Sequence, residues 1–137
     1  MILPQFYTDD IIKRAILEDI NYVDVASDYL ISEEQRNEAY FVSKADGVLC
    51  GIDVAMRVFE LLDDSFTAKV YMHDGDKVKK GDLIAEFSGK TTLLLKGERT
   101  ALNLLQHMSG IATATAKAVK LCEGTKASIA DTRKTIP

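Results

Sequence analysis

The sequence predicts an α+β protein, an open-faced α/β sandwich at the amino terminus followed by the first strand of a β/α barrel. Apolar residues repeat at helical spacing in three segments: 8–19, 52–63 and from residue 97 onward. Strand-like segments lie between them, notably at 66–72 and 78–87. Helices segregated on an antiparallel sheet form an α+β layer. A final apolar run at 127–130, followed at once by a polar cluster, is the candidate barrel strand.

The first helix is predicted at 8–19. Thr8 or Asp9 can cap its amino terminus. The apolar face is predicted to consist of Ile11, Ile12, Ala15, Ile16 and Leu17. The acidic stretch at 18–24 then breaks the helical pattern. Clustered acids can form a metal site, but they are more typical of a capped, solvated turn, which is the interpretation favoured here.

A β-hairpin is predicted next. Residues 37–44 alternate partly between apolar and polar side chains, Asp46-Gly47 is a strong turn signal, and 48–50 form the returning strand. The helix at 52–63 then ends in Asp63-Asp64. Two aspartates after an apolar run can hold ribose hydroxyls when they follow a strand. Here the preceding residues repeat at helical spacing, which favours a helix end and a turn.

Two stretches in the strand region invite rival interpretations. The segment 74–87, DGDKVKKGDLIAEF, resembles the hairpin of biotinyl and lipoyl carrier domains, but no lysine lies in a suitable turn for modification. Ser88-Gly89-Lys90 resembles the end of a phosphate-binding loop. That motif needs a glycine where this chain has Ile84, and a helix where 92–96 favours a strand. We therefore expect 88–90 to be a turn between two strands.

The long helix beginning near residue 97 is expected to bury one face. That face carries Leu104, Met108, Ile111, Thr115, Ala118 and Cys122. Gly124 is a plausible carboxyl-terminal cap, and 127–130 is the strand candidate. Its carboxyl end carries Asp131-Thr132-Arg133-Lys134, at the rim where β/α barrels build active sites. The expected domains are 1–110, the sandwich, and 111–137, the start of an incomplete barrel.

Composition indicates an ordinary globular protein of the cytoplasm. Apolar residues make up 47% of the chain, and no signal peptide or membrane-length apolar run is evident. Cys50 and Cys122 lack a CxxC partner and are expected to be reduced and buried. With His73 and His107 they form no metal-binding spacing. A net charge of −4 argues against a general nucleic-acid surface.

Charge is distributed unevenly along this acidic chain. From residue 97 onward six Lys and Arg side chains are accompanied by only three acids. Such a surplus of cations can serve an anionic ligand. Lys117, Lys120 and Lys126 are better explained as a solvated surface, which leaves Arg99, and Arg133 with Lys134, as candidate ligand-binding residues.

Three stretches resemble quinolinate phosphoribosyltransferase, also called nicotinate-nucleotide pyrophosphorylase (carboxylating). They are ERTALNLLQHMSGIATATAKA at 98–118, ADTRKT at 130–135, and LEDINYVDVASDYLI at 17–31. The resemblance spans essentially the whole chain and implies a hammerhead or barrel-sandwich-like amino-terminal domain. Members of the family are about twice as long as this chain. A β/α barrel typically needs about 250 residues, so one strand cannot close it. Val23 departs from the glycine that the family usually has before Asp24.

The resemblance implies an enzyme that makes nicotinate mononucleotide, CO2 and pyrophosphate from quinolinate and phosphoribosyl pyrophosphate, in NAD biosynthesis. It implies that Arg99, Thr132, Arg133 and Lys134 bind quinolinate, with Arg99 acting in the site of a neighbouring subunit. A homodimer or higher oligomer with shared active sites is therefore expected, without nucleic-acid or membrane partners. No catalytic residue is assignable here, and Mg²⁺ ligands are expected beyond Pro137.

Two alternatives remain open at this stage. The chain can be a piece of the related molybdenum-transport-associated homologue, or a non-catalytic interaction or carrier-like module. As an amino-terminal portion with one barrel strand, it is expected to be inactive alone. It is also expected to self-associate through the uncovered face of its long helix.

Overall fold

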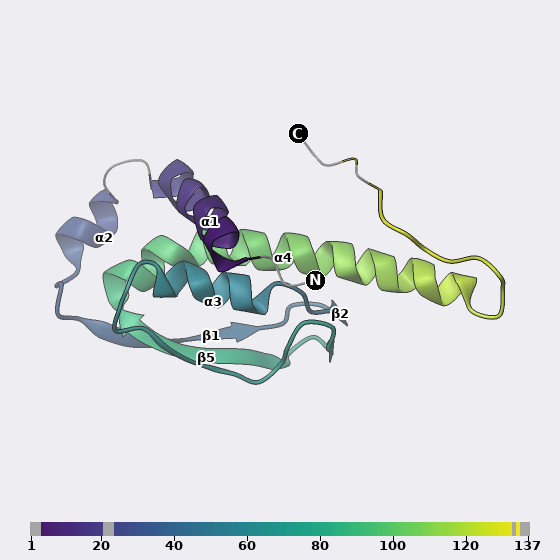
Figure 1. Ribbon diagram of the computed structural model, residues 1–137. Helices are drawn as coiled ribbons and strands as arrows, with labels where there is room; N and C mark the ends of the chain where they lie inside the picture. The colour runs from purple at the N-terminus through teal and green to yellow at the C-terminus, as the bar shows by residue number, and fades with distance from the viewer. Residues whose placement is uncertain (1–3, 21–23, 133, 135–137) are drawn as a thin grey trace.

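The computed structural model describes residues 4–20, 24–132 and 134 of the chain. Its elements, in chain order, are α1 (Gln5–Ile20), α2 (Val25–Leu30), β1 (Arg36–Val42), β2 (Gly47–Val48), α3 (Ile52–Glu60), β3 (Thr67–Val70), β4 (Lys77–Val78), β5 (Leu83–Lys90) and α4 (Thr91–Cys122). Figure 1 shows α1, α3 and α4 stacked over one side of the sheet. The predicted α+β class is confirmed.

Three strands form the main sheet in the order β1-β5-β3, and both pairings are antiparallel. The predicted hairpin at 37–50 is wrong. The strand after the Asp46-Gly47 turn, β2, pairs with β4 in a separate two-stranded sheet, and β1 pairs with β5. The Asp46-Gly47 signal does not mark a reversal of the chain. Val42 lies opposite Leu83 and Gly47 opposite Val78, so β1 and β2 run in the same direction along the segment that contains β4 and β5.

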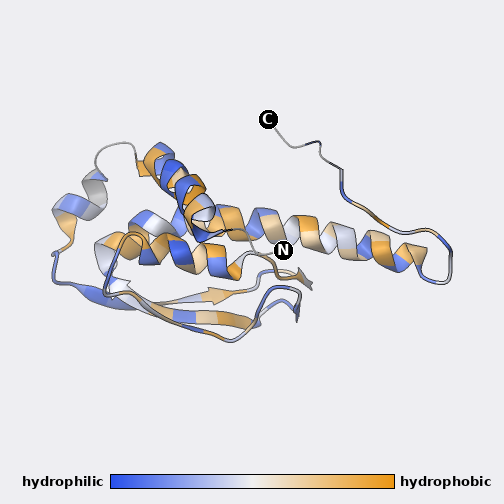
Figure 2. Ribbon diagram, viewed as in Figure 1, coloured by the Kyte–Doolittle hydropathy of each residue, from blue (hydrophilic) through white to orange (hydrophobic). Residues whose placement is uncertain are grey.

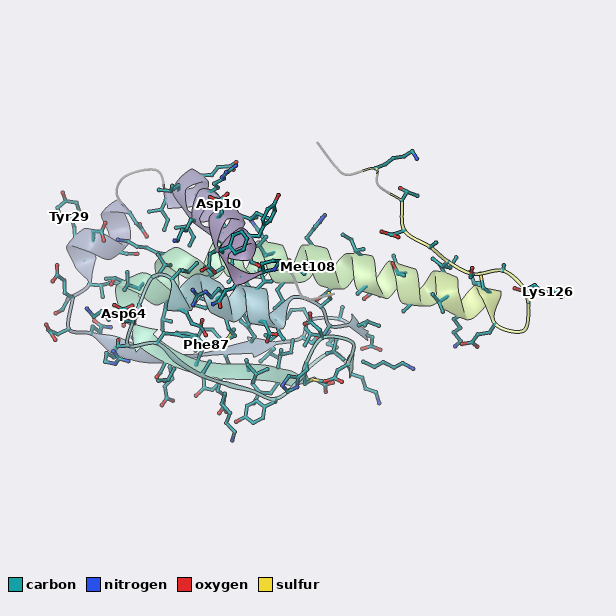
Figure 3. All side chains as sticks on the ribbon, viewed as in Figure 1. Asp10, Tyr29, Asp64, Phe87, Met108 and Lys126 are labelled. Atoms are coloured by element: carbon teal, nitrogen blue, oxygen red, sulfur yellow. The ribbon has the colours of Figure 1, made fainter. Side chains whose placement is uncertain are left out.

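Four phenylalanines fill the space between the sheet and the helices. Phe41 from β1, Phe59 from α3 and Phe87 from β5 are almost fully buried, and Phe66 packs beside them. The Phe59 ring is stacked on Phe66 and Phe87, with centroids 5.4 and 5.0 Å apart. Figure 3 shows Phe87 pointing from the sheet toward the helices. Such aromatic pairs add stability beyond their buried area.

The passage from β5 to α4 differs from the expectation. Residues 88–90 belong to β5, and α4 begins at Thr91, so the predicted turn at 88–90 and strand at 92–96 are both wrong. A short apolar run does not distinguish a strand from a buried helical turn, and Leu94 is buried in the core. The objection to a phosphate loop that rested on a missing helix therefore fails. The objection from Ile84 stands, because that residue is buried within β5.

The second half of α4 projects beyond the sheet (Figure 1). On the predicted apolar face, Leu104 and Met108 are half-buried, but Ile111 and Thr115 are exposed. Leu121 is 84% exposed, and Figure 2 shows hydrophobic residues along this projecting part. After α4 the chain turns, and 127–132 form no regular structure, so the predicted strand at 127–130 is not present.

Of the two predictions about acidic segments, the one for Asp63 is confirmed, but the one for 18–24 is wrong in its first part, because residues 18–20 belong to α1. Asp63 lies just past α3 and accepts hydrogen bonds from the backbone N–H groups of Ser65 and Lys90, which confirms a helix end and turn. Asp24 is the N-cap of the six-residue helix α2, which was not predicted. The glycine replacement at Val23 lies outside the described residues. The two cysteines are free but half-buried instead of buried.

Candidate functional site

Arg99 lies in the third turn of α4 and extends into solvent. Its side chain is 74% exposed, and Nη1 donates to Asp19 Oδ1 of α1 at 3.0 Å. Asp19 itself is only 21% exposed. No hydrogen bond within the described part of the chain engages the other guanidinium nitrogens of Arg99. The remaining edge of the planar guanidinium therefore faces solvent with its donors available for an anion.

Arg57 shows what an arginine committed to structure looks like in the same protein. Its Nε and Nη2 both donate to the carboxylate of Asp9 at 2.8 Å, and Nη1 donates to Glu60 at 3.0 Å. The hydrogen bond from Arg57 lowers the pKa of Asp9, and the same bond, with a second one to Glu60, raises the pKa of Arg57. Every guanidinium nitrogen of Arg57 has a partner: Nε and Nη2 join α3 to Asp9 of α1, and Nη1 binds Glu60 on α3 itself. Arg99 is therefore the better candidate for binding a ligand.

A second cation lies one turn from Arg99 on α4. The Lys96 ammonium is paired with the carboxylate of Asp28 in α2, and both side chains are largely covered. Two acids of the amino-terminal segment, Asp19 and Asp28, thus face two neighbouring cations of α4. Sequence analysis treated the acidic stretch at 18–24 as a solvated turn and did not recognise Asp19. An acid in the last turn of a helix was the available signal, because that end of the dipole disfavours negative charge.

The other predicted ligand-binding residues lie in the segment after α4. Thr132 and Lys134 are exposed, and the backbone N–H of Lys134 donates to Thr132 Oγ1 at 3.4 Å. Arg133 lies outside the described residues. From Arg99 to Cys122 the helix rises about 35 Å at its usual pitch, and Lys126 lies beyond its far end (Figure 3). No hydrogen bond or ion pair between described residues joins Arg99 to Thr132 or Lys134.

A groove of about 1160 Å³ runs between β1 and α4. Its floor is apolar, with Phe41, Phe87 and Leu105, and Glu98 lies on its rim. Arg99 does not line it, and neither do the described residues Asp131, Thr132 and Lys134. A polyanion would therefore find few cations there, and we do not place the ligand site in this groove.

Asp74 has a structural role that the sequence did not reveal. Its Oδ1 accepts hydrogen bonds from the backbone N–H groups of Gly51 and Ile52, at the start of α3. The Cys50 thiol contacts the same carboxylate at 3.7 Å, and burial followed by the charge of Asp74 raises the pKa of that thiol. A raised pKa keeps Cys50 protonated and unreactive.

Within the described ranges, no three His, Cys, Asp or Glu side chains lie close enough together to hold a metal ion. His73 and His107 are both exposed. None of the described helices combines the length and the apolar character needed to cross a membrane.

Known proteins with similar sequence and structure share one family. Residues 24–109 match the model of the quinolinate phosphoribosyl transferase N-terminal domain. A probable nicotinate-nucleotide pyrophosphorylase (carboxylating) of Bacillus subtilis is 40% identical over 127 residues, which are 93% of this chain and 44% of that protein. The mitochondrial quinolinate phosphoribosyltransferase (decarboxylating) 2b of Nicotiana tabacum is 36% identical over 135 residues, 98% of this chain and 38% of that protein.

Solved structures agree with the sequence comparisons. The crystal structure of NadC from Streptococcus pyogenes superimposes with a TM-score of 0.94 at 37% identity, over 100% of this chain and 49% of that one. The nicotinate-nucleotide pyrophosphorylase of Francisella tularensis gives a TM-score of 0.90 at 33% identity, over 99% of this chain and 49% of that one. The chain thus spans less than half the length of these relatives, in each comparison. The domain match, the sequence identity to known relatives and the structural superposition agree. This chain belongs to the quinolinate phosphoribosyl transferase family and contains that family's N-terminal domain.

Proposed function

We propose that this chain is the amino-terminal portion of an enzyme that joins quinolinate to phosphoribosyl pyrophosphate. The products are nicotinate mononucleotide, pyrophosphate and CO2, and the setting is NAD biosynthesis in the cytoplasm. The observation that carries the proposal is the match of 24–109 to the quinolinate phosphoribosyl transferase N-terminal domain. The names of the relatives, which specify quinolinate or nicotinate nucleotide and a carboxylating or decarboxylating reaction, support it.

Arg99 would bind the substrate as a carboxylate ligand. Quinolinate carries two adjacent carboxylates, and a guanidinium can donate two parallel hydrogen bonds to one of them. Arg99 is suited to this because it is exposed and uses a single nitrogen in its ion pair with Asp19. The fully committed Arg57 offers no such free edge.

Thr132, Arg133 and Lys134 would hold the same substrate from the segment after α4. A hydroxyl and two cations complement the second carboxylate and the remaining acceptor atoms of the ring. These residues would hold the ring nitrogen close to the ribose carbon from which pyrophosphate leaves. Such positioning of the two reactants would provide most of the rate acceleration. When CO2 leaves, negative charge develops on the ring carbon, and the same cations stabilise it.

The site would be assembled from two copies of the protein. Among the described residues, no hydrogen bond or ion pair joins Arg99 to Thr132 or Lys134. A homodimer in which Arg99 enters the neighbouring subunit's site would bring these groups together. The proposal includes an open-faced, barrel-sandwich-like arrangement of this domain and a barrel whose first strand forms from 127–130 in the complete enzyme.

Mg²⁺ is proposed as the cation that accompanies pyrophosphate in the complete enzyme, because it readily binds phosphate oxygens. The described residues provide no group of three metal ligands. No Mg²⁺ ligand is therefore assigned within the described part of this chain.

The test is the formation of nicotinate mononucleotide from quinolinate and phosphoribosyl pyrophosphate. We expect the complete enzyme to form it, and a polypeptide of these 137 residues alone to form none. Turnover by the 137-residue polypeptide would show that the substrate-binding groups are already assembled within it. Absence of turnover by the complete enzyme would refute the proposed activity.

Substrate binding is tested separately from turnover. In the complete enzyme, Arg99→Ala should raise the KM for quinolinate, because one carboxylate loses its charged hydrogen bonds. Arg14→Ala is the matched control, since Arg14 is an exposed arginine on α1 whose ion pair among the described residues is with Asp10 of the same helix. In calorimetric titration of the 137-residue polypeptide, we expect at most weak quinolinate binding, which Arg133→Ala should remove.

A further inference from the structure

We propose that Asp19 is the positioning residue for Arg99: it holds the guanidinium so that one edge is fixed to the domain and the other edge is presented to the quinolinate carboxylate. This inference rests on the proposed function and deepens it. It concerns a residue that neither the sequence motifs nor the match to the family assigns to a role in the site.

Arg99 needs an external constraint because its own packing provides little. With 74% of its side chain exposed, few neighbours restrict its rotamers. Arginine is among the side chains that lose most rotamer freedom when they are ordered. A ligand that met an unrestrained Arg99 would have to order it during binding, and that cost would weaken the complex.

Asp19 is placed firmly enough to supply the constraint. It lies in the last turn of α1, and Ile12 and Ile16 of the same helix are buried against the core. The pair of hydrogen bonds between Asp9 and Arg57 joins α1 to α3 as well. The carboxylate of Asp19 therefore has a fixed position relative to α4, although the sequence separates it from Arg99 by 80 residues.

The position of Asp19 is unfavourable for the helix that carries it. A negative charge in the last turn of a helix opposes the helix dipole, and α1 has no basic residue there to compensate. Asp19 is also largely covered, at 21% exposure. Its compensating charge comes from Arg99 on another helix, which is expected if the pair serves α4 and its ligand more than α1.

The geometry leaves Arg99 able to bind while it is held. Nη1 donates to Asp19, and Nε and Nη2 have no hydrogen-bond partner within the described residues. A guanidinium presents its donors in a rigid planar fork, so fixing one nitrogen also fixes the direction of the others. The Arg99 side of the ion pair is exposed to solvent, and such solvated pairs are weak, so Asp19 orients the cation without competing strongly against a dicarboxylate.

Asp19 has a negative charge and could act on quinolinate binding in two ways, which change the KM in opposite directions. If Asp19 acted only as a competing anion, its removal would strengthen quinolinate binding. If it acts as the positioning residue, its removal weakens binding, and Asp19→Asn, whose amide oxygen still accepts the hydrogen bond, loses less than Asp19→Ala. The sign of the change in KM therefore decides between them.

The first measurement needs no ligand and uses the chain as it is. In a ¹⁵N-labelled sample, the heteronuclear NOE of the Arg99 Nε–Hε group reports fast side-chain motion. We expect this NOE to fall in Asp19→Ala and to stay unchanged in Asp10→Ala. Asp10 is the matched control because its side chain is 60% exposed and its ion pair among the described residues is with Arg14 of the same helix. An Arg99 NOE that is the same in wild type and Asp19→Ala overturns the inference.

The second measurement uses the complete enzyme. We expect Asp19→Ala to raise the KM for quinolinate by about three- to tenfold, the cost of ordering one long side chain, with kcat little changed because the interaction is uniform in ground and transition states. In an Arg99→Ala background, Asp19→Ala should have no further effect. A KM that is unchanged or lower in Asp19→Ala overturns the inference.

The two levels of the argument fail differently. If Arg99→Ala raises the KM for quinolinate and Asp19→Ala does not, the proposed function stands and only the role of Asp19 is wrong. If Arg99→Ala leaves the KM unchanged, Arg99 is not a quinolinate ligand, and the assignment of Arg99 and the role of Asp19 fall together.

Discussion

Replacing either of two glycines of α4 with alanine is expected to change the free energy of unfolding, in opposite directions at the two positions. Gly97 packs against α3, where an added Cβ would lie 2.8 Å from Cδ1 and Cε1 of Phe59 and 3.2 Å from Cδ1 of Leu62. Gly110, thirteen residues later in the same helix, has nothing within 4 Å of the same position. Replacing each with alanine therefore separates helix propensity from packing.

The magnitude follows from which effect is larger at each site. Alanine is better than glycine in a helix interior by about 0.8–1 kcal/mol. At Gly97 this gain is opposed by overpacking, which costs about 1–3 kcal/mol in a well-packed core. Phe59 cannot move aside easily, because it is 1% exposed and stacked on Phe66 and Phe87. We therefore expect Gly97→Ala to destabilise by about 1 kcal/mol and Gly110→Ala to stabilise by about 0.5–1 kcal/mol.

The assay is urea unfolding followed by circular dichroism at the helical band, since the chain has no tryptophan to report by fluorescence. The two variants should differ by nearly 2 kcal/mol, and thermal midpoints should separate by about 5–8 °C for a domain of this size. Equal stabilisation by both alanines would refute the reasoning, because it would mean that α3 and α4 do not approach closely at Gly97.

Three further predictions concern stability and association. The hydrogen bond from Arg57 lowers the pKa of Asp9, so this contribution to folding stability is present above the ordinary pKa of 3.8 and is lost as the pH falls through the lowered value. In unfolding curves measured from pH 5 downward, Asp9→Asn should reduce the loss of stability with falling pH. An unchanged loss would contradict the assignment. Asp63→Ala should cost about 2–3 kcal/mol in urea unfolding, because the backbone N–H of Lys90 loses its partner near the core; a loss below about 0.5 kcal/mol would show that water replaces the carboxylate. The purified 137-residue chain should self-associate in sedimentation experiments through the projecting part of α4, and Leu121→Ser, at a site 84% exposed, should weaken that association; a monomer at every concentration would count against it.

The fold class could be predicted from the sequence, because the spacing of apolar residues in a helix depends only on residues close together in the chain. Of the residues predicted on the apolar face of α1, Ile12 and Ile16 are buried, but Ile11 and Leu17 are exposed. The end of α3 before Asp63 could also be predicted from the change in pattern. The start of α4 could not. Its N-cap residue, Lys90, makes no side-chain capping hydrogen bond, and the run from Leu93 to Leu95 suits a strand as well as a helix.

Pairing of short strands was beyond the sequence for a different reason. β2 and β4 contain two residues each, and they are paired across the chain from Gly47–Val48 to Lys77–Val78. Two residues carry too little alternation to define a strand or its partner. The position of β2 is set by its contact with α4, where Thr113 Oγ1 accepts a hydrogen bond from the backbone N–H of Val48 at 2.9 Å.

The amino-acid sequence by itself determined the approximate positions of α1, α3 and α4, the α+β class and the family, and it made Arg99 a candidate ligand, because these depend on periodicity and on motifs contiguous in the chain. Tertiary structure alone decided that Asp19 meets Arg99, that β1 pairs with β5, and that α4 continues past the sheet. Each of these depends on groups separated by dozens of residues, whose approach is set by the packing of whole helices against a shared core and not by any local preference.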